Sequence, residues 1–306
     1  MSSCKWRRCD IFSNKQYFSH SVLQLLRGKS SRKVDEAVRV LHKREAPASD
    51  EALPIYSRLV GSVLGRSLQE DKGPEYADIV ALLREILFKL ANQYRKKGDK
   101  KAAADVSELL MSTHYTHMMV TTHTHGLTDL SAKCAITLLK YPDYIPQDKA
   151  FYIAGMYAKE QGNINLAFLL LNRFVDITEA IDSADPGYLD NTQLEEADAV
   201  PLNGPLPSSH YVSDEDLREE VRTWVLSIVT DSSVEQRLKP RNNSKGTLYE
   251  GLYSSDRPTC IVTGFPVHPV DMLEVNNSTA NRKDWNFLVA KTHTCPWTGK
   301  PQNPIY

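Results

Sequence analysis

Two short segments near the C-terminal end of the chain carry the same pattern of cysteine, threonine and glycine. Residues 260–267 read CIVTGFPV and residues 295–301 read CPWTGKP, so both contain C-x-x-T-G. A zinc knuckle places a second cysteine where these segments have threonine, and its paired thiolates clamp the metal. Threonine does not ligate zinc. The pattern therefore predicts two knuckle-like turns in which hydrogen bonds replace the metal.

Each segment has the residues that such a replacement needs. Gly264 and Gly299 can supply the positive φ of a tight turn, and the threonine before each glycine can hydrogen-bond the loop backbone. We expect four residues to stabilise the two loops: Cys260, Thr263, Cys295 and Thr298. Between the loops, residues 281–291 place three apolar side chains on one helical face: Trp285, Leu288 and Val289.

Two metal-binding alternatives stay open at this point. Two cysteines and two histidines could hold one structural zinc, namely Cys260, His268, His293 and Cys295, although their spacing is unusual. A second set of histidines comprises His114, His117, His123 and His125. No cysteine or carboxylate completes this second set until Asp129 and Cys134. The pattern therefore favours a polar helix surface or packing between helices over a metal site.

Composition excludes several classes of protein. The 306 residues include 37 basic and 38 acidic side chains, and this balance gives no bulk attraction to nucleic acid. The longest apolar run, Leu166 to Leu171, is far shorter than the ~20 residues of a membrane span. Five cysteines suit a reducing cytosol rather than a disulfide framework. G-x-G-x-x-G, G-x-S-x-G and H-E-x-x-H motifs are absent, so we expect no cofactor.

The elements that must position these loops are mostly helical. Over residues 1–182, apolar residues recur at steps of three and four, which is typical of successive amphipathic helices. The run A-x-x-Y-x-x-x-G-D-x-x-x-A from Ala91 is matched by G-x-x-A-x-x-x-G-N-x-x-x-A from Gly155. Their separation fits two repeats of about 32 residues, close to the 34-residue helix-turn-helix period. This region therefore resembles tetratricopeptide repeats in a degenerate form, although a generic helical bundle is the alternative.

A proline-rich and acidic stretch follows the helical region. Residues 183–213 read as a linker, because eleven acidic residues but no lysine or arginine lie between Arg173 and Arg218. Such a segment repels itself and favours an extended, solvated tether. Residues 214–246 then form a connecting helix and loop, for which we expect Ser213 as the N-cap. The helix should turn five apolar residues inward: Leu217, Val221, Trp224, Val225 and Ile228.

The C-terminal 60 residues, 247–306, resemble a U-box, the metal-free relative of the RING finger of ubiquitin ligases. The resemblance rests on the two C-x-x-T turns, Pro269-Val270 and the helix that carries Trp285. It implies that this module binds ubiquitin or a ubiquitin-conjugating enzyme and uses no covalent catalytic residue. The binding residues it implies are Val262, Phe265, Trp285, Pro296 and Trp297. Ile261 departs from the family's proline, so whether ubiquitin is transferred or only bound stays open.

Taken whole, the chain resembles the C-terminal region of the largest-subunit family of the intraflagellar transport B complex. Residues 216–226 (DLREEVRTWVL), 260–267 and 283–292 (KDWNFLVAKT) occur in the same order in that family. The resemblance implies a scaffold protein of the cilium or flagellum and basal body, within the cytoplasm, whose partners are other transport subunits. That subunit is much longer, so the resemblance also implies that this chain is a fragment of it. The alternative is an unrelated helical-repeat adaptor with a small zinc domain.

Overall fold

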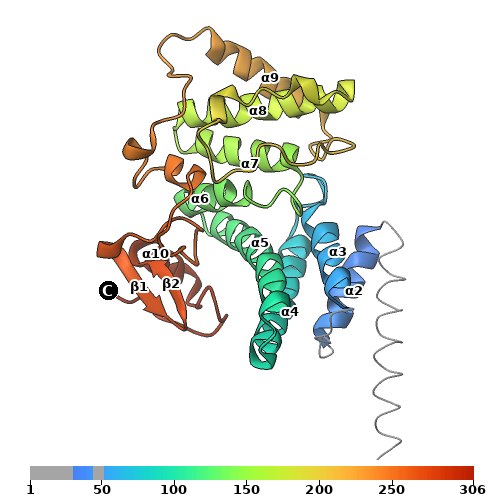
Figure 1. Cartoon of the computed structure of the whole chain (residues 1–306), viewed down its shortest axis with the longest axis vertical. Helices are drawn as coiled ribbons and strands as arrows, with labels where there is room; N and C mark the ends of the chain where they lie inside the picture. The colour runs from blue at the N-terminus through green and yellow to red at the C-terminus, as the bar shows by residue number, and fades with distance from the viewer. Residues whose placement is uncertain (1–29, 44–51) are drawn as a thin grey trace, which may run out of the picture. The chain divides into compact units, whose positions relative to one another are not determined.

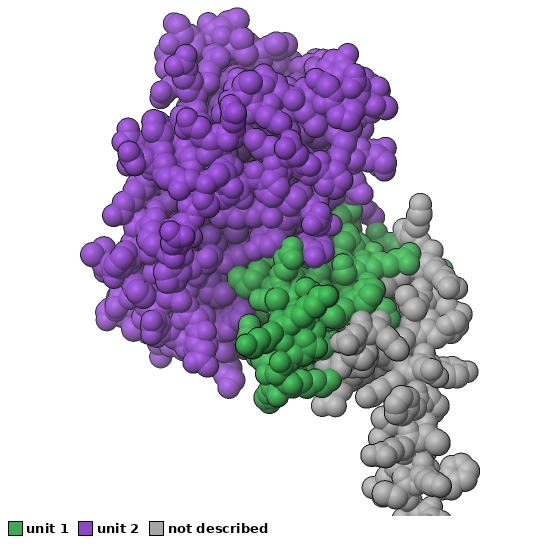
Figure 2. Space-filling view, viewed as in Figure 1, with its two compact units in different colours: residues 1–66, 73–114 green, residues 67–72, 115–306 purple. Residues whose placement is uncertain are grey.

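The chain is mostly helical and carries one small sheet. The computed structural model describes residues 30–43 and 52–306, and in this part of the chain nine α-helices and two strands occur (Figure 1). None of the described helices has both the length and the apolar character that crossing a membrane requires. The chain divides into two compact units, residues 1–66 with 73–114 and residues 67–72 with 115–306 (Figure 2).

The first unit packs the helices of the N-terminal part. The helices are α2 (Ser31–Lys43), α3 (Leu53–Leu64), α4 (Pro74–Lys97) and the first part of α5 (Lys100–Thr124). Tyr76, Ile79 and Leu83 lie on the apolar face of α4 and are buried, as the helical spacing predicts. Gly98 ends α4 with φ 74°, and the Asp99 side chain accepts a hydrogen bond from Ala102 N at 3.0 Å.

The second unit continues with the rest of α5 and three further helices. These are α6 (Thr128–Leu138), α7 (Gln147–Glu160) and α8 (Ile164–Ser183). Gly162 has φ 70° at the end of α7, and Asn163 caps α8 by accepting from Leu166 N at 3.4 Å. The glycine and the Asn or Asp of the repeated sequence run thus end one helix and start the next in both units.

The proline-rich segment after α8 is a strap on the second unit rather than a free tether. The carboxylate of Asp148 on α7 is completely buried and accepts hydrogen bonds from Tyr211 N at 2.6 Å and Val212 N at 3.1 Å. Arg173 on α8 donates to the carbonyls of Asp190 at 3.1 Å and Leu202 at 3.0 Å. Backbone groups of the strap satisfy these buried side chains, and four apolar residues of the strap are themselves buried, namely Leu194, Ala197, Val200 and Val212. Both kinds of contact hold this acidic segment in place.

The connecting helix α9 (Glu215–Val229) begins one residue later than expected. Asp214, not Ser213, is its N-cap and accepts from Leu217 N at 3.3 Å. Three of the expected apolar residues are buried, namely Val221, Val225 and Ile228. Leu217 and Trp224 are only half-buried, and the Trp224 ring receives the Lys159 ammonium at 4.6 Å from its centroid.

The last 60 residues contain the two predicted turns and the predicted helix, together with one β-hairpin. Strands β1 (Met272–Val275) and β2 (Ser278–Asn281) pair antiparallel and lead directly into α10 (Arg282–Thr292), as the orange and red segments of Figure 1 show. Asn276 and Asn277 join the strands with positive φ angles of 53° and 59°, the backbone that a two-residue hairpin turn requires.

A close approach between α7 and α8 gives the first testable prediction. A Cβ at Gly155 would lie 2.6 Å from the Leu171 side chain, whereas a Cβ at Gly61 in α3 would meet nothing within 4 Å. We expect Gly155→Ala to lower the free energy of unfolding by ~1 kcal/mol, because overpacking outweighs the gain in helix propensity. Gly61→Ala should raise it by about 0.5–1 kcal/mol. Urea denaturation followed by circular dichroism measures both, and equal effects of the two substitutions would refute the close approach.

Candidate functional site

The first C-x-x-T-G segment forms a closed turn. Thr259 and Pro266 pair as an isolated antiparallel bridge at its base. Cys260 N donates to Phe265 O at 2.8 Å, and Gly264 N donates to Cys260 O at 2.8 Å. Gly264 has φ 76°, a conformation that side chains with a Cβ rarely adopt. The turn is therefore a knuckle that backbone hydrogen bonds close at its base.

The second C-x-x-T-G segment repeats this geometry. Thr294 and Pro301 form the bridge at the base of the turn. Cys295 N donates to Lys300 O at 2.8 Å, Gly299 N donates to Cys295 O at 2.8 Å, and Gly299 has φ 68°. The same residue types at the same positions thus produce the same turn twice.

Hydrogen bonds from neighbouring segments reach the cysteine sulfurs at the positions where a knuckle would place metal. Cys260 Sγ accepts from Asn281 N at 3.3 Å, at the point where β2 meets α10. Cys295 Sγ accepts from Asn276 Nδ2 at 3.3 Å, from the hairpin turn, and from Thr298 N at 3.4 Å. Each turn is therefore tied by its sulfur to one end of the β1–β2 hairpin. Burial raises the pKa of the Cys260 thiol, which keeps it in the neutral form.

The two threonines behave differently from each other. Thr298 Oγ1 accepts from Lys300 N at 3.4 Å, which is the loop-backbone bond that the sequence predicts. Thr263 Oγ1 instead donates to the buried Asp284 carboxylate at 3.4 Å. Thr263 also hydrogen-bonds Cys260 within its own loop, so it connects the first knuckle turn both to itself and to the N-terminal end of α10.

The described residues provide no ligand set for the zinc alternative. In this part of the chain, no three His, Cys, Asp or Glu side chains come together so that they could hold a metal ion. The ring of His268 lies between Arg257 Nη1 at 3.0 Å and Glu250 Oε2 at 3.1 Å, and thus has polar partners of its own.

The histidines of the second candidate set have separate partners too. His114 Nδ1 accepts from Arg84 Nε at 2.9 Å inside the first unit. The His123 ring lies 5.4 Å from the Tyr157 ring, and His125 Nδ1 lies 2.8 Å from Thr121 O. These contacts match the expectation of inter-helix packing and polar helix surface.

The five residues that the U-box resemblance implies for partner binding are all buried in this chain. The exposed fraction is 0% for Val262 and Trp285, 3% for Phe265 and 8% for Trp297, and Pro296 is also buried. Trp285 packs on the inner face of α10 together with Leu288 and Val289, as the helical spacing predicts. The structure thus brings these residues into one module but presents none of them as an open groove.

Helix α6 and the end of α5 cover the first turn. Thr137 Oγ1 donates to Thr263 O at 2.7 Å, and Cys134 Sγ donates to Val262 O at 3.3 Å. The hydroxyl of Tyr115 donates to Cys260 O at 3.3 Å. A Cβ at position 264 would overlap the Thr137 side chain, so glycine is needed there for contact as well as for its φ angle.

An ion pair joins α6 to α10, the helix of the C-terminal module. Lys133 Nζ lies 3.0 Å from Asp284 Oδ1 on α10 and 2.8 Å from Asp129 Oδ2 on its own helix. The Lys133 and Asp284 side chains are 18% and 6% exposed. Burial by itself lowers the pKa of Lys133, but Asp284 and Asp129 outweigh it and raise that pKa. The ammonium therefore stays charged and compensates a carboxylate that would otherwise be buried alone.

None of these covering residues carries a sequence signal for its role. Thr137 and Thr263 are 126 positions apart, and Lys133 and Asp284 are 151 positions apart. Periodicity and motif spacing report local structure only, so they identified the turns but not the helix that lies on them.

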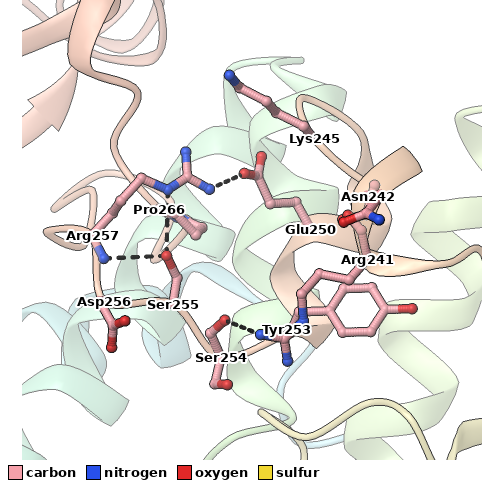
Figure 3. A pocket seen from close by; sticks show the side chains of 11 residues that line it. Arg241, Asn242, Lys245, Glu250, Tyr253, Ser254, Ser255, Asp256, Arg257 and Pro266 are labelled. Carbon is pink, nitrogen blue, oxygen red and sulfur yellow. Dashed lines mark hydrogen bonds and ion pairs between the residues drawn. The ribbon is translucent and has the colours of Figure 1, made fainter.

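A polar cavity of about 520 Å³ lies beside the first turn. Eleven residues line it: Arg241, Asn242, Ser244, Lys245, Glu250, Tyr253, Ser254, Ser255, Asp256, Arg257 and Pro266. Figure 3 shows Arg257 directed at Glu250, and the two form an ion pair. Arg241 pairs with Asp198 at 2.6 Å, so carboxylates balance both arginines of the cavity. Arg241 is thus held by an ion pair at the edge of the cavity.

Comparison with known proteins finds relatives that are named intraflagellar transport proteins. An intraflagellar transport protein 172 homolog from Danio rerio is 29% identical over 303 residues, and the homolog from Mus musculus is 31% identical over 307 residues. Each match covers 95% of this chain and 17% of the relative. Intraflagellar transport protein 172 from Chlamydomonas reinhardtii is 30% identical over 275 residues, which is 83% of this chain and 15% of that protein. The chain thus spans about a sixth of the length of these curated relatives, in their C-terminal part. No family model matches it.

The buried ion pair gives the second prediction. Lys133→Met should lower the free energy of unfolding by ~2–3 kcal/mol, because it leaves Asp284 buried without a counter-charge. Asp129→Asn should cost less than ~0.5 kcal/mol, since Asp129 is 56% exposed. The double variant Lys133→Met with Asp284→Asn should recover part of the loss. Chemical denaturation of wild type and the three variants tests this, and a double variant no more stable than Lys133→Met would contradict the coupling.

Proposed function

The chain is a homologue of a C-terminal part of intraflagellar transport protein 172, and from this relationship we propose that it serves as a scaffold subunit of the intraflagellar transport train and is needed for cilium assembly. Relatives from Mus musculus and Chlamydomonas reinhardtii carry intraflagellar transport in their names, and so does a protein called osm-1 from Caenorhabditis elegans. The proposed location is the cilium or flagellum and the basal body, on the cytoplasmic side of the membrane.

The helical part is the proposed docking surface for other transport subunits. Pairs of helices whose ends carry Gly98 with Asp99 and Gly162 with Asn163 support a tetratricopeptide-like reading of residues 1–182. Stacked helix pairs provide extended surfaces that suit protein partners. The strap of residues 183–213 and the connecting residues 214–246 then join this part to the C-terminal module.

Residues 247–306 are proposed to be a U-box-like module that recognises a ubiquitin-conjugating enzyme or ubiquitin. One observation carries this proposal: two knuckle turns of the same geometry, whose sulfurs accept hydrogen bonds from a hairpin that leads into a helix. Such a module holds its partner and positions a thioester for attack by a lysine, so its contribution is binding and orientation. Val262 and Pro296 are the proposed contact residues of the two turns, and Phe265, Trp285 and Trp297 are the further proposed binding residues.

The scaffold proposal predicts recovery of transport subunits from a ciliary extract. The full chain used as bait should enrich several intraflagellar transport subunits, identified by mass spectrometry. A Pro296→Ala bait should recover the same set, because docking is assigned to the helices and not to the second turn. If the full chain enriches no transport subunit over a heat-denatured bait, the scaffold proposal is wrong.

The recognition proposal predicts a defined loss of partner binding. Val262→Ala and Pro296→Ala should each weaken binding to a conjugating enzyme about tenfold, because each removes apolar contact area from one turn. Val270→Ala is the matched control, since Val270 is 99% exposed in the same module but lies outside both turns. Biolayer interferometry against a panel of conjugating enzymes and free ubiquitin measures the affinities. Circular dichroism confirms that each variant is folded, and unchanged affinities in folded variants would reject the contact residues.

A further inference from the structure

The two knuckle turns share a backbone geometry but differ in what covers them. Every residue from Cys260 to Val267 in the first turn is buried, whereas Gly299 and Lys300 at the tip of the second turn are exposed. This difference cannot come from the turns themselves, because their closing hydrogen bonds match in partners and in length. It comes from the segments that lie on the first turn, which are α6 through Thr137 and Cys134, the end of α5 through Tyr115, and the stretch around Gly251 beside Phe265.

The contact between α6 and the C-terminal module includes three buried or part-buried polar groups beside apolar side chains such as Ile136. A hydroxyl from Thr137, a thiol from Cys134 and an ammonium from Lys133 reach the module from one helix. When two such surfaces separate, water can satisfy each of these groups, so the cost of opening is smaller than for an apolar contact of the same area. Chemistry of this kind suits a contact that can be released.

We infer that α6 is an intramolecular cap on the first turn, and that a ubiquitin-conjugating enzyme reaches Val262 only after the module has separated from α6. This inference rests on the proposed recognition function and adds its regulation. The cap lowers the apparent affinity by the fraction of molecules in which it is open. α6 and the enzyme therefore compete for one surface, and a change that weakens the cap strengthens binding.

The test changes α6 and leaves the module intact. Thr137→Glu places a charge and added bulk against Gly264, where Thr137 is 1% exposed. Thr137→Val keeps the shape of the side chain and removes only the hydrogen bond to Thr263 O. Thr128→Glu is the matched control, because Thr128 lies exposed on the same helix. All variants are made in the full chain.

Two buried thiols report opening and distinguish it from unfolding. Cys134 on α6 is 0% exposed, and its thiol donates a hydrogen bond to Val262 O. Cys295 in the second turn is 1% exposed, and its sulfur accepts a hydrogen bond from Asn276 of the same module. Release of the cap exposes Cys134 and leaves Cys295 covered, whereas unfolding exposes both. Alkylation by iodoacetamide, followed by peptide mass spectrometry, gives the labelling rate of each cysteine.

We expect Thr137→Glu to raise both the Cys134 labelling rate and the affinity for a conjugating enzyme about tenfold, with Thr137→Val intermediate and Thr128→Glu unchanged. The cap is refuted if Cys134 labelling rises while affinity stays at the wild-type value. It is equally refuted if neither Thr137 variant raises Cys134 labelling ahead of Cys295. Failure of the recognition function looks different: Cys134 labelling rises but no enzyme of the panel binds any variant, and the inference then falls with that function.

Discussion

The buried contact between the first knuckle turn and α6 is the constraint on which the C-terminal part of this chain depends. Asp284 lies in the first turn of α10, and its carboxylate is buried inside the protein. A buried carboxylate must be paired with a charge and hydrogen-bonded. Lys133 provides the charge from α6, and Thr263 provides a hydroxyl from the turn. Three segments distant in sequence are thereby held at one point, and Gly264 allows the backbone to come close enough.

This constraint has an energetic reason. A structural zinc contributes about 10–16 kcal/mol to the folding of a small knuckle domain. The hydrogen bonds that reach the Cys260 and Cys295 sulfurs here are neutral, and a typical intramolecular bond adds only about 0.5–1.5 kcal/mol. A module of 60 residues has a small core of its own. Packing on the helices of the second unit supplies burial that the turns alone do not provide, and residues of the proposed binding surface become buried in the process.

The acidic strap follows the same principle in another place. Its acidic residues have no lysine or arginine among them, and segments with many like charges usually stay in solvent. Asp148 and Arg173 change this outcome, because each is buried on a helix and is hydrogen-bonded to backbone groups of the strap. The buried polar groups of the helices and the unpaired backbone of the strap satisfy each other.

The sequence alone determined the local features of this protein. The glycines that end helices, the paired C-x-x-T-G turns and the apolar face with Trp285 are all encoded by residues a few positions apart, which share one turn of helix or one loop. Tertiary structure alone decided that Asp148 holds the strap, that Thr263 bonds Asp284, and that α6 contacts the backbone of the first turn at Val262. These outcomes depend on which surfaces meet after the chain has folded. The spacing of residues in the sequence does not predict the contact between Thr137 and Thr263, which are 126 positions apart. Side-chain periodicity describes a single helix or strand and not the elements that pack against it.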